Sequence, residues 1–479
     1  MKTLRNLLFL TLSVGLLFSC SKDGSDEAFT GIDLKSRNVT PQVFVVTPSG
    51  GDDTPAICQA FDDAKAAGPG SVVQLLSGEY YLGLMEVRDF CGVFKGAGKS
   101  KTIINVMNGL DLLSLWNKGQ GGNLVKFVGG DVQLRDFTIR TPEGRLSVTG
   151  PANGIIGALF NFSACNAQYE AGNTNRSINV VIDNVSCKGQ LLEGGVGYTR
   201  GYSCYFAIRA GWDQPWGTDI PREKIEFKIT NSEFDTFCYG LVLEAMKDGS
   251  IIVGENGKGN TFSNIDQAAG VWECRNTQVS IQGNTFNIRE FSYGLDLDDY
   301  PYYANLRNEP SETATIFNVQ NNIFNMIHSE YALWLRNRRT YTYPEEPAVI
   351  YQVKNNLFNM TDGYEWGIIS YFTKGAVIRN NRFSGHGDLA LYLVNYSRNG
   401  LVLGNNFSSA EFGTAVAYLT ASTRDWTFVG GNIADQVINF GTNNLITGFS
   451  VNNAEAPFGQ AIVDNLNDTK EALRDLKKH

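Results

Sequence analysis

The second half of the chain alternates short apolar runs with polar turns. Between residues 230 and 450 these runs are four to six residues long and rich in Val, Ile, Leu and Tyr, as in "YGLVLE", "QVSIQG" and "GLVLGN". Short runs of this composition, bounded by Gly and Asn, are typical of β-strands. Helical patterns of ten or more residues are missing from this region, which excludes the helical repeat classes.

A motif of asparagine and phenylalanine marks the period of the pattern. It reads "NNIFNM", "NNLFNM", "NNRFSG" and "NNFSSA", and its shortest spacings are 24 and 25 residues. The phenylalanines of the series are Phe234, Phe262, Phe286, Phe324, Phe358, Phe383 and Phe407. A period of this length indicates a solenoid. Three short strands in each unit predict one coil of a parallel β-helix, with strands stacked about 4.8 Å apart.

The motif itself is predicted to be scaffold. Asparagine tolerates the left-handed backbone of a tight turn and hydrogen-bonds its own backbone there. Stacked turns place asparagine over asparagine, so that side-chain amides can bond along a column. Phenylalanine then points into the core and stacks on its equivalent in the next coil. We therefore assign no functional site to the motif.

The region before the repeats predicts a cap. "TPAICQAFDDAKAA" has the pattern of an amphipathic helix, with Thr54 expected at the N-cap, Pro55 at the first helical position, and Ile57, Phe61 and Ala64 on one apolar face. The strands that follow contain "LSGEYYL" and "GAGKSKT". This arrangement resembles the N-terminal cap of the pectin-lyase-like right-handed β-helix superfamily, over roughly residues 43–450. The resemblance implies a right-handed coil whose open core is plugged by the helix, and it says little about activity.

Both ends of the chain carry signals outside the repeat region. A basic start, a short apolar run and "LFSC" predict a signal peptide over residues 1–19. "LFSC" resembles the lipobox of bacterial lipoproteins, which implies lipidation of Cys20, and the acidic stretch after it resembles the surface-export signal of Bacteroidetes lipoproteins. We therefore expect an outer-membrane lipoprotein that faces the cell surface, with residues 20–42 as a flexible tether. Residues 43–452 form the β-helix domain, and residues 453–479 form a C-terminal helix with Ile462, Leu466, Leu473 and Leu476 near one face.

Charge and motif content exclude several functions. The formal net charge is −9, which disfavours binding to nucleic acid because phosphate binding needs Lys and Arg. The chain has three histidines and lacks the GxSxG, HExxH and Walker patterns. We expect a monomer whose partner is a polysaccharide.

Six runs align as rungs of one sheet and place polar residues on its outer face. The rungs are "GLVLEA", "GVWECR", "GLDLDD", "ALWLRN", "GIISYF" and "ALYLVN". Alternate residues of a strand point to opposite faces, so the leucines point inward. The outward residues are Glu244, Asp296, Asp298, Trp334, Arg336 and Tyr392. In the second rung either Trp272 or Glu273 faces outward, because a shift of one residue flips every side chain.

Carboxylates beside flat aromatic rings suit a groove that binds sugars. Two insertions, at residues 299–312 and 337–347, are expected to wall this groove and to add Tyr341 and Arg338 as substrate contacts. We predict Asp296, Asp298 and Arg336 as catalytic residues. Glu244, Glu273, Trp334 and Tyr392 are predicted substrate contacts.

Three activities fit these residues. Asp296 and Asp298, two apart on one face, place their carboxyls about 6–7 Å apart, near the separation in inverting glycoside hydrolases. A "GHG" at residues 385–387 resembles the polygalacturonase-like hydrolases, but it lies 88 residues beyond Asp298 and the "NTD" of that family is missing, so we assign it to a loop.

The second activity is β-elimination on a uronic-acid polymer, with Arg336 as neutraliser or base and calcium held at Asp298 and Asp299. The third is glycan binding or adhesion without catalysis, because fold alone does not decide function. We favour cleavage of a uronic-acid-containing polymer by a lyase or a hydrolase.

Overall fold

The computed structural model describes residues 40–108, 110, 123–142, 156–164, 177–192, 201–211, 224–289, 292–298, 315–337, 349–431 and 435–452. The first strand is β1 (Val43–Val46) and the last is β34 (Ser450–Asn452). The predicted signal peptide, the predicted lipidation site Cys20 and the predicted C-terminal helix lie outside these residues. In the described ranges, no helix is both long and apolar enough to cross a membrane.

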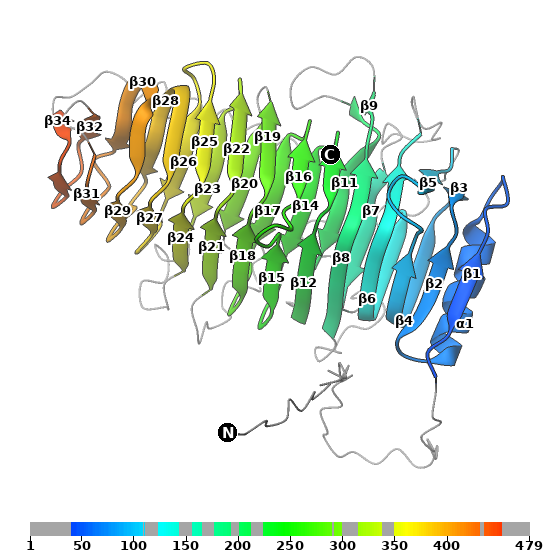
Figure 1. Cartoon of the computed structure of the whole chain (residues 1–479). Coiled ribbons are helices and arrows are strands. Elements are labelled where there is room, and N and C mark those ends of the chain that lie inside the picture. The colour runs from blue at the N-terminus through cyan, green and yellow to red at the C-terminus, as the bar shows by residue number, and fades with distance from the viewer. Residues whose placement is uncertain are drawn as a thin grey trace, which may run out of the picture. The chain divides into compact units, whose positions relative to one another are not determined.

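Helix α1 (Thr54–Ala67) covers the N-terminal end of the core, beside β1 and β2 (Figure 1). Its buried face contains Ile57 and Phe61, and Phe61 packs its ring 4.9 Å from that of Phe90. The N-cap prediction was wrong by one residue, because Asp53 occupies that position. The hydroxyl of Thr54 instead accepts a hydrogen bond from the Gly83 amide, at 2.7 Å.

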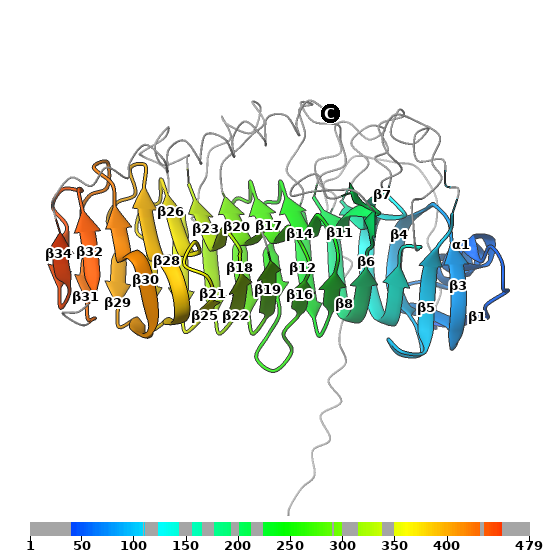
Figure 2. The ribbon, with the colours of Figure 1, turned by 90° about the horizontal axis from the view of Figure 1, so that it is seen from above.

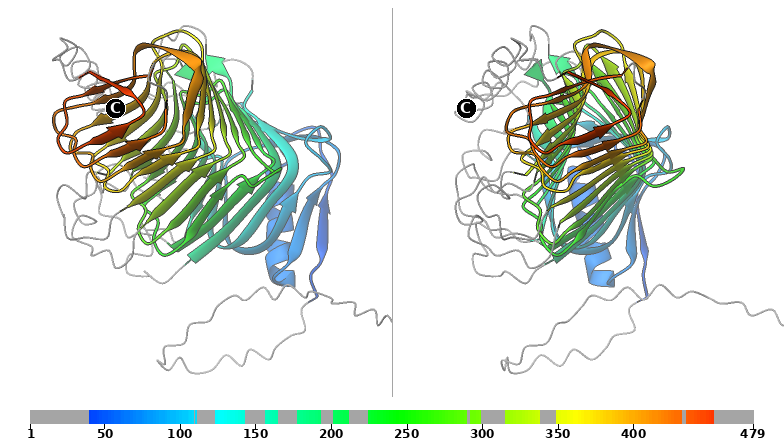
Figure 3. Two further views of the ribbon diagram at one scale, coloured as in Figure 1. Left: turned by 60° about the vertical axis from the view of Figure 1, so that its left-hand side comes forward. Right: turned by 90° about the vertical axis from the view of Figure 1, so that its left-hand side faces the viewer.

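The chain folds as a right-handed parallel β-helix, whose coils stack in the order of the sequence (Figures 1 and 2). Each coil contributes one strand to each of three sheets, which Figure 3 shows from the end of the stack. The first sheet contains β7 (Ile156–Ser163), β11 (Cys204–Ala210), β14 (Tyr239–Glu244), β17 (Gln267–Trp272), β20 (Tyr293–Asp298), β23 (Tyr331–Arg336), β26 (Trp366–Tyr371), the ends of β28 (Arg382–Val394) and β30 (Asn406–Leu419), β32 (Gln436–Asn439) and β34.

The other two sheets close each coil. The second contains β8 (Ser177–Lys188), β12 (Lys224–Thr230), β15 (Ser250–Val253), β18 (Gln278–Gln282), β21 (Ile316–Gln320), β24 (Ile350–Lys354), β27 (Val377–Arg379), β29 (Leu401–Leu403), β31 (Thr427–Val429) and β33 (Leu445–Thr447). The third contains β13 (Glu233–Asp235), β16 (Thr261–Ser263), β19 (Thr285–Arg289), β22 (Ile323–Ile327), β25 (Leu357–Met360) and the first halves of β28 and β30.

The N-terminal coils contain two strands that are longer than ten residues. They are built from β2 (Ser71–Leu75), β3 (Gly78–Leu82), β4 (Met85–Lys95), β5 (Thr102–Val106) and β6 (Val125–Arg140). The short strands β9 (Leu191–Leu192) and β10 (Gly201–Tyr202) form an antiparallel pair outside the stack.

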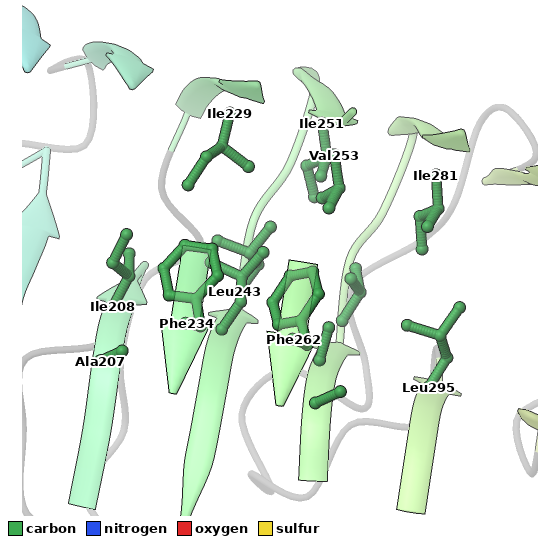
Figure 4. Close-up of a cluster of buried hydrophobic side chains, with 14 of the residues drawn as sticks. Ala207, Ile208, Ile229, Phe234, Leu243, Ile251, Val253, Phe262, Ile281 and Leu295 are labelled. Atoms are coloured by element: carbon green, nitrogen blue, oxygen red, sulfur yellow. The ribbon is translucent and has the colours of Figure 1, made fainter. Parts of the chain in front are cut away.

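The phenylalanine column is confirmed. Successive rings from Phe234 to Phe407 lie 4.7–5.1 Å apart, and Phe324 stacks on Phe286 at 5.0 Å and on Phe358 at 4.8 Å. Figure 4 shows the first two rings of the column, Phe234 and Phe262, side by side in the core with Leu243 and Leu295. The column therefore holds the coils in register through the hydrophobic interior.

The two asparagines of the motif have different roles. Asn321 takes the left-handed turn, with φ of 56°, and is exposed. Asn322 is buried and belongs to a ladder, in which its Oδ1 accepts from the Asn284 amide and side chain at 3.0 Å, and its Nδ2 donates to Asn356 at 3.0 Å. The ladder members are Asn260, Asn284, Asn322, Asn356, Asn381 and Asn405. In "NNFSSA" the ladder residue is the first asparagine, because Gly404 makes the turn.

Asn322→Ala is expected to lower the free energy of unfolding by about 2–4 kcal/mol, because it leaves buried donors of Asn284 and the carbonyl of Ile281 without partners. Asn321→Gly is the matched control, since glycine adopts the left-handed turn without strain. Urea unfolding followed by circular dichroism measures both. Equal midpoints for the two variants would contradict the stabilising role of the ladder.

Candidate functional site

The register of the first sheet brings the predicted residues into two rows on its outer face. One row joins Glu244, Trp272, Asp298, Arg336 and Tyr371 across successive coils. The other joins Val242, Gly270, Asp296, Trp334, Ile369 and Tyr392. The leucines between them are fully buried in the core, as predicted. Parallel strands without insertions inside them keep each row straight, which is why residues about 25–40 apart in sequence become neighbours.

In the second rung, Trp272 and not Glu273 belongs to the outward row. Its indole stands in the row between Glu244 and Asp298. Glu273 follows at the corner of the coil, with φ of 56°, and its amide donates to the Asp298 carbonyl at 2.8 Å. Glu273 is therefore buried behind the row that was predicted to bind substrate.

Arg336 ties the two aspartates together. Its Nε donates to Asp296 Oδ1 at 2.8 Å, and its Nη2 donates to the second oxygen of the same carboxylate. The Asp298 Oδ2 atom lies 3.4 Å from the same Nε. All three side chains are at most 6 % exposed. The guanidinium also lies 4.4 Å from the centre of the Trp334 ring. A bidentate pair inside an apolar setting is strong and geometrically specific.

A second ion pair flanks this cluster. Arg209 on β11 lies 3.4 Å from Glu244 and 5.1 Å from the centre of the Phe206 ring. The predicted substrate contact Glu244 is only 1 % exposed. The face thus contains three carboxylates and two guanidinium groups within five consecutive coils, from β11 to β23.

Trp272 lies over the glycine of its own strand. A Cβ built on Gly270 would stand 2.6 Å from the indole ring, so a side chain at this position would displace Trp272. Gly270 is the neighbour of Asp296 in the row. The ring of Tyr239 meets Trp272 edge-on at 6.0 Å. An aromatic surface therefore stands directly beside the aspartates.

Tyrosines at this face keep their protons. Burial, followed by electrostatic repulsion from Cys238 and Asp296, raises the pKa of Tyr239 well above its usual value. Burial also raises the pKa of Tyr392. Both phenols are therefore hydrogen-bond donors at neutral pH rather than bases.

Several predicted residues lie outside the described part of the chain. They are the substrate contacts Tyr341 and Arg338 and the calcium ligand Asp299. Among the described residues there is no group of three or more His, Cys, Asp or Glu side chains that could hold a metal ion. At Asp298 the nearby guanidinium of Arg336 would repel a cation.

One hollow of the described surface lies away from these residues. Its volume is about 520 Å³, and its lining comes from turns of the N-terminal coils, including Lys99, Asp136, Asp183, Asn231 and Glu233. These groups bind one another, as in the 2.6 Å contact between Lys99 and Glu233 and the 2.7 Å bond from Asn231 to Asp183. The hollow contains none of the residues that the sequence placed in the site.

Sequence reasoning missed the residue that begins each rung. Tyr239, Gln267, Tyr293, Tyr331 and Trp366 form a third column across the coils, and the rings of Tyr293 and Tyr331 stack at 4.2 Å. Each stands immediately before a small residue, as in "YG", "QA" and "YA". This sequence pattern, a large residue followed by a small one, was the signal that could have identified the column.

No protein-family model matches the chain, and no curated protein matches it. Solved structures do. The A-module of the mannuronan C-5 epimerase AlgE6 of Azotobacter vinelandii is 14 % identical, with a TM-score of 0.44 over 85 % of this chain and 96 % of that one. The family 28 exopolygalacturonase of Yersinia enterocolitica is 11 % identical, with a TM-score of 0.44 over 87 % and 76 %.

PfbA, a surface adhesin of Streptococcus pneumoniae, is 13 % identical, with a TM-score of 0.46 over 80 % of this chain and 94 % of that one. At these sequence identities and TM-scores, the similarities do not indicate a function for this chain. The function is therefore argued from the chain's own side chains.

Proposed function

We propose that the protein acts on a polysaccharide at the outer face of the first sheet, and that its substrate is a polymer containing uronic acid. The observation that supports this most is the cluster of Asp296, Asp298 and Arg336 with Trp334 and Trp272 on neighbouring strands. Aromatic rings bind the apolar faces of sugars, carboxylates bind hydroxyls, and guanidinium groups bind carboxylates.

Two reactions suit the cluster. In hydrolysis, one carboxyl protonates the leaving oxygen and the other activates water. Asp296 accepts the bidentate bond from Arg336, and Asp298 lies 3.4 Å from the same guanidinium Nε, so the two carboxyls share one cation and either could take either role. In β-elimination, a base removes the proton from the carbon next to the uronate carboxyl, a carbon–carbon double bond forms as the C–O bond to the leaving sugar breaks, and a protonated group such as Tyr239 donates its proton to the leaving oxygen.

A panel of polymers tests the proposal. The protein is incubated with polygalacturonate, alginate and a neutral glucan, with and without a chelator. Ultraviolet absorbance from unsaturated uronate reports elimination, and new reducing ends without that absorbance report hydrolysis. Activity that is present without the chelator and lost with it would indicate that the predicted calcium is required.

Asp298→Asn is expected to lower kcat by about 10²-fold or more on whichever polymer is cleaved, because it removes a proton-transfer group. Asp425→Asn, whose side chain is 43 % exposed on the surface, should leave kcat unchanged. Activity retained by Asp298→Asn, in protein whose melting temperature matches the wild type, would contradict the assignment.

Glycan binding without catalysis is the second candidate. One observation favours it: Asp296 and Asp298 both form buried ion pairs with Arg336, an arrangement that also occurs in purely structural clusters. Binding of a uronate polymer without any cleavage product, measured by calorimetry, would select this candidate.

A further inference from the structure

The outer face of the first sheet is far more buried than the outer faces of the other two. On the first sheet Ile369, Tyr392 and Tyr418 are 1 %, 3 % and 4 % exposed. On the other sheets of the same region the outward residues Ile323 and Val429 are 38 % and 39 % exposed. A side chain that points away from the core is this strongly buried only where something covers it. The first sheet is therefore covered along its C-terminal half.

The covered surface is apolar. Outward residues from β20 to β32 form a continuous cluster separate from the core, which we call the outer aromatic strip; its members include Tyr331, Trp334, Ile369, Tyr392, Tyr418 and Ile438. The register joins these residues from coil to coil. A strip of this kind left in water would be an unusually large apolar patch.

The chain leaves the solenoid at the end of this strip. The last strand, β34, pairs with β32 and so belongs to the first sheet. Residues 453–479 follow, and their predicted helix has Ile462, Leu466, Leu473 and Leu476 near one face. A helix over residues 459–478 would be about 30 Å long. Six strand spacings separate β34 from β20, which is about 29 Å.

We propose that residues 453–479 of this chain dock as an amphipathic helix on the outer aromatic strip and run back along the stack from β34 toward β20. Length, starting point and the apolar face of the segment all match the strip. The direction also brings Lys477 and Lys478 toward Glu244, Asp296 and Asp298, where carboxylates outnumber guanidinium groups. Docked there, the helix would cover Trp334 and Tyr392, so neither ring could contact a substrate while the helix is docked. The docking itself does not depend on the proposed catalysis.

Hydrogen–deuterium exchange of the full chain tests the docking. In the wild type, amides of residues 460–478 should exchange slowly. The double variant Leu466→Asp and Leu473→Asp should speed that exchange about tenfold or more, because charges on the apolar face detach the helix. Tyr418→Asp, on the strip, should have the same effect on residues 460–478. Val429→Asp, on the second sheet, is the matched control and should change nothing there.

Three results would overturn the proposal. The first is fast exchange of residues 460–478 in the wild type. The second is exchange of residues 460–478 that stays slow in both the Tyr418→Asp variant and the double variant. An unchanged melting temperature would show that the coils of these variants are folded. The third is protection that disappears on dilution, which would show that a second copy of the chain supplies the helix.

Discussion

Arg336→Ala is expected to lower the free energy of unfolding by about 3–5 kcal/mol, because it leaves two buried carboxylates without their cation. Asp296 loses both bonds of its bidentate pair, and Asp298 loses the guanidinium 3.4 Å away. Trp334 also loses the cation that packs on its ring. Urea unfolding measures the change, and hydrogen exchange in β20 and β23 locates it.

Two further variants define the cause. Arg336→Lys keeps the charge but cannot make the bidentate pair, so an intermediate loss is expected. Arg424→Ala removes an arginine that is 54 % exposed and should cost less than about 1 kcal/mol. A loss for Arg336→Ala no greater than that for Arg424→Ala would show that the aspartates do not depend on this guanidinium.

Phe324→Ala is expected to lower the free energy of unfolding by about 3–5 kcal/mol, because it leaves a cavity in the core. The ring is fully buried and stacks on a phenylalanine above and another below, at 5.0 and 4.8 Å. Because the coils repeat, the loss should appear first as faster exchange in β19, β22 and β25, the strands that carry these three rings.

The control for the cavity lies on the same strand. Ile327 on β22 points outward and is 41 % exposed, so Ile327→Ala should change stability by less than about 1 kcal/mol. Similar losses for the two variants would mean that the ring column contributes no more than ordinary surface packing.

The repeat made the fold predictable. Each coil restates the same turn, ladder and core residue, so spacing alone aligned the rungs and placed Asp298 beside Arg336. The N-cap of the capping helix was predicted one residue too late. Asp53 and Thr54 make hydrogen bonds to distant residues, and the local sequence pattern does not reveal such bonds. The rung at Gly270 could not be oriented from alternation, since both registers placed one polar or aromatic residue outward. The corner after Trp272 decided it, through the left-handed backbone of Glu273.

The amino-acid sequence was enough to predict the parallel β-helix, the helical cap, the inward leucines and the face that carries Asp296, Asp298, Trp334 and Arg336. These follow from periodicity, because a repeated pattern of apolar and turn residues has one consistent way to bury its core. The packing of the coils was needed to show that Arg336 binds both aspartates, that Trp272 lies over Gly270, and that the outer face is buried. Those contacts join side chains from different coils. The residue pattern of a single strand does not define the distances between them.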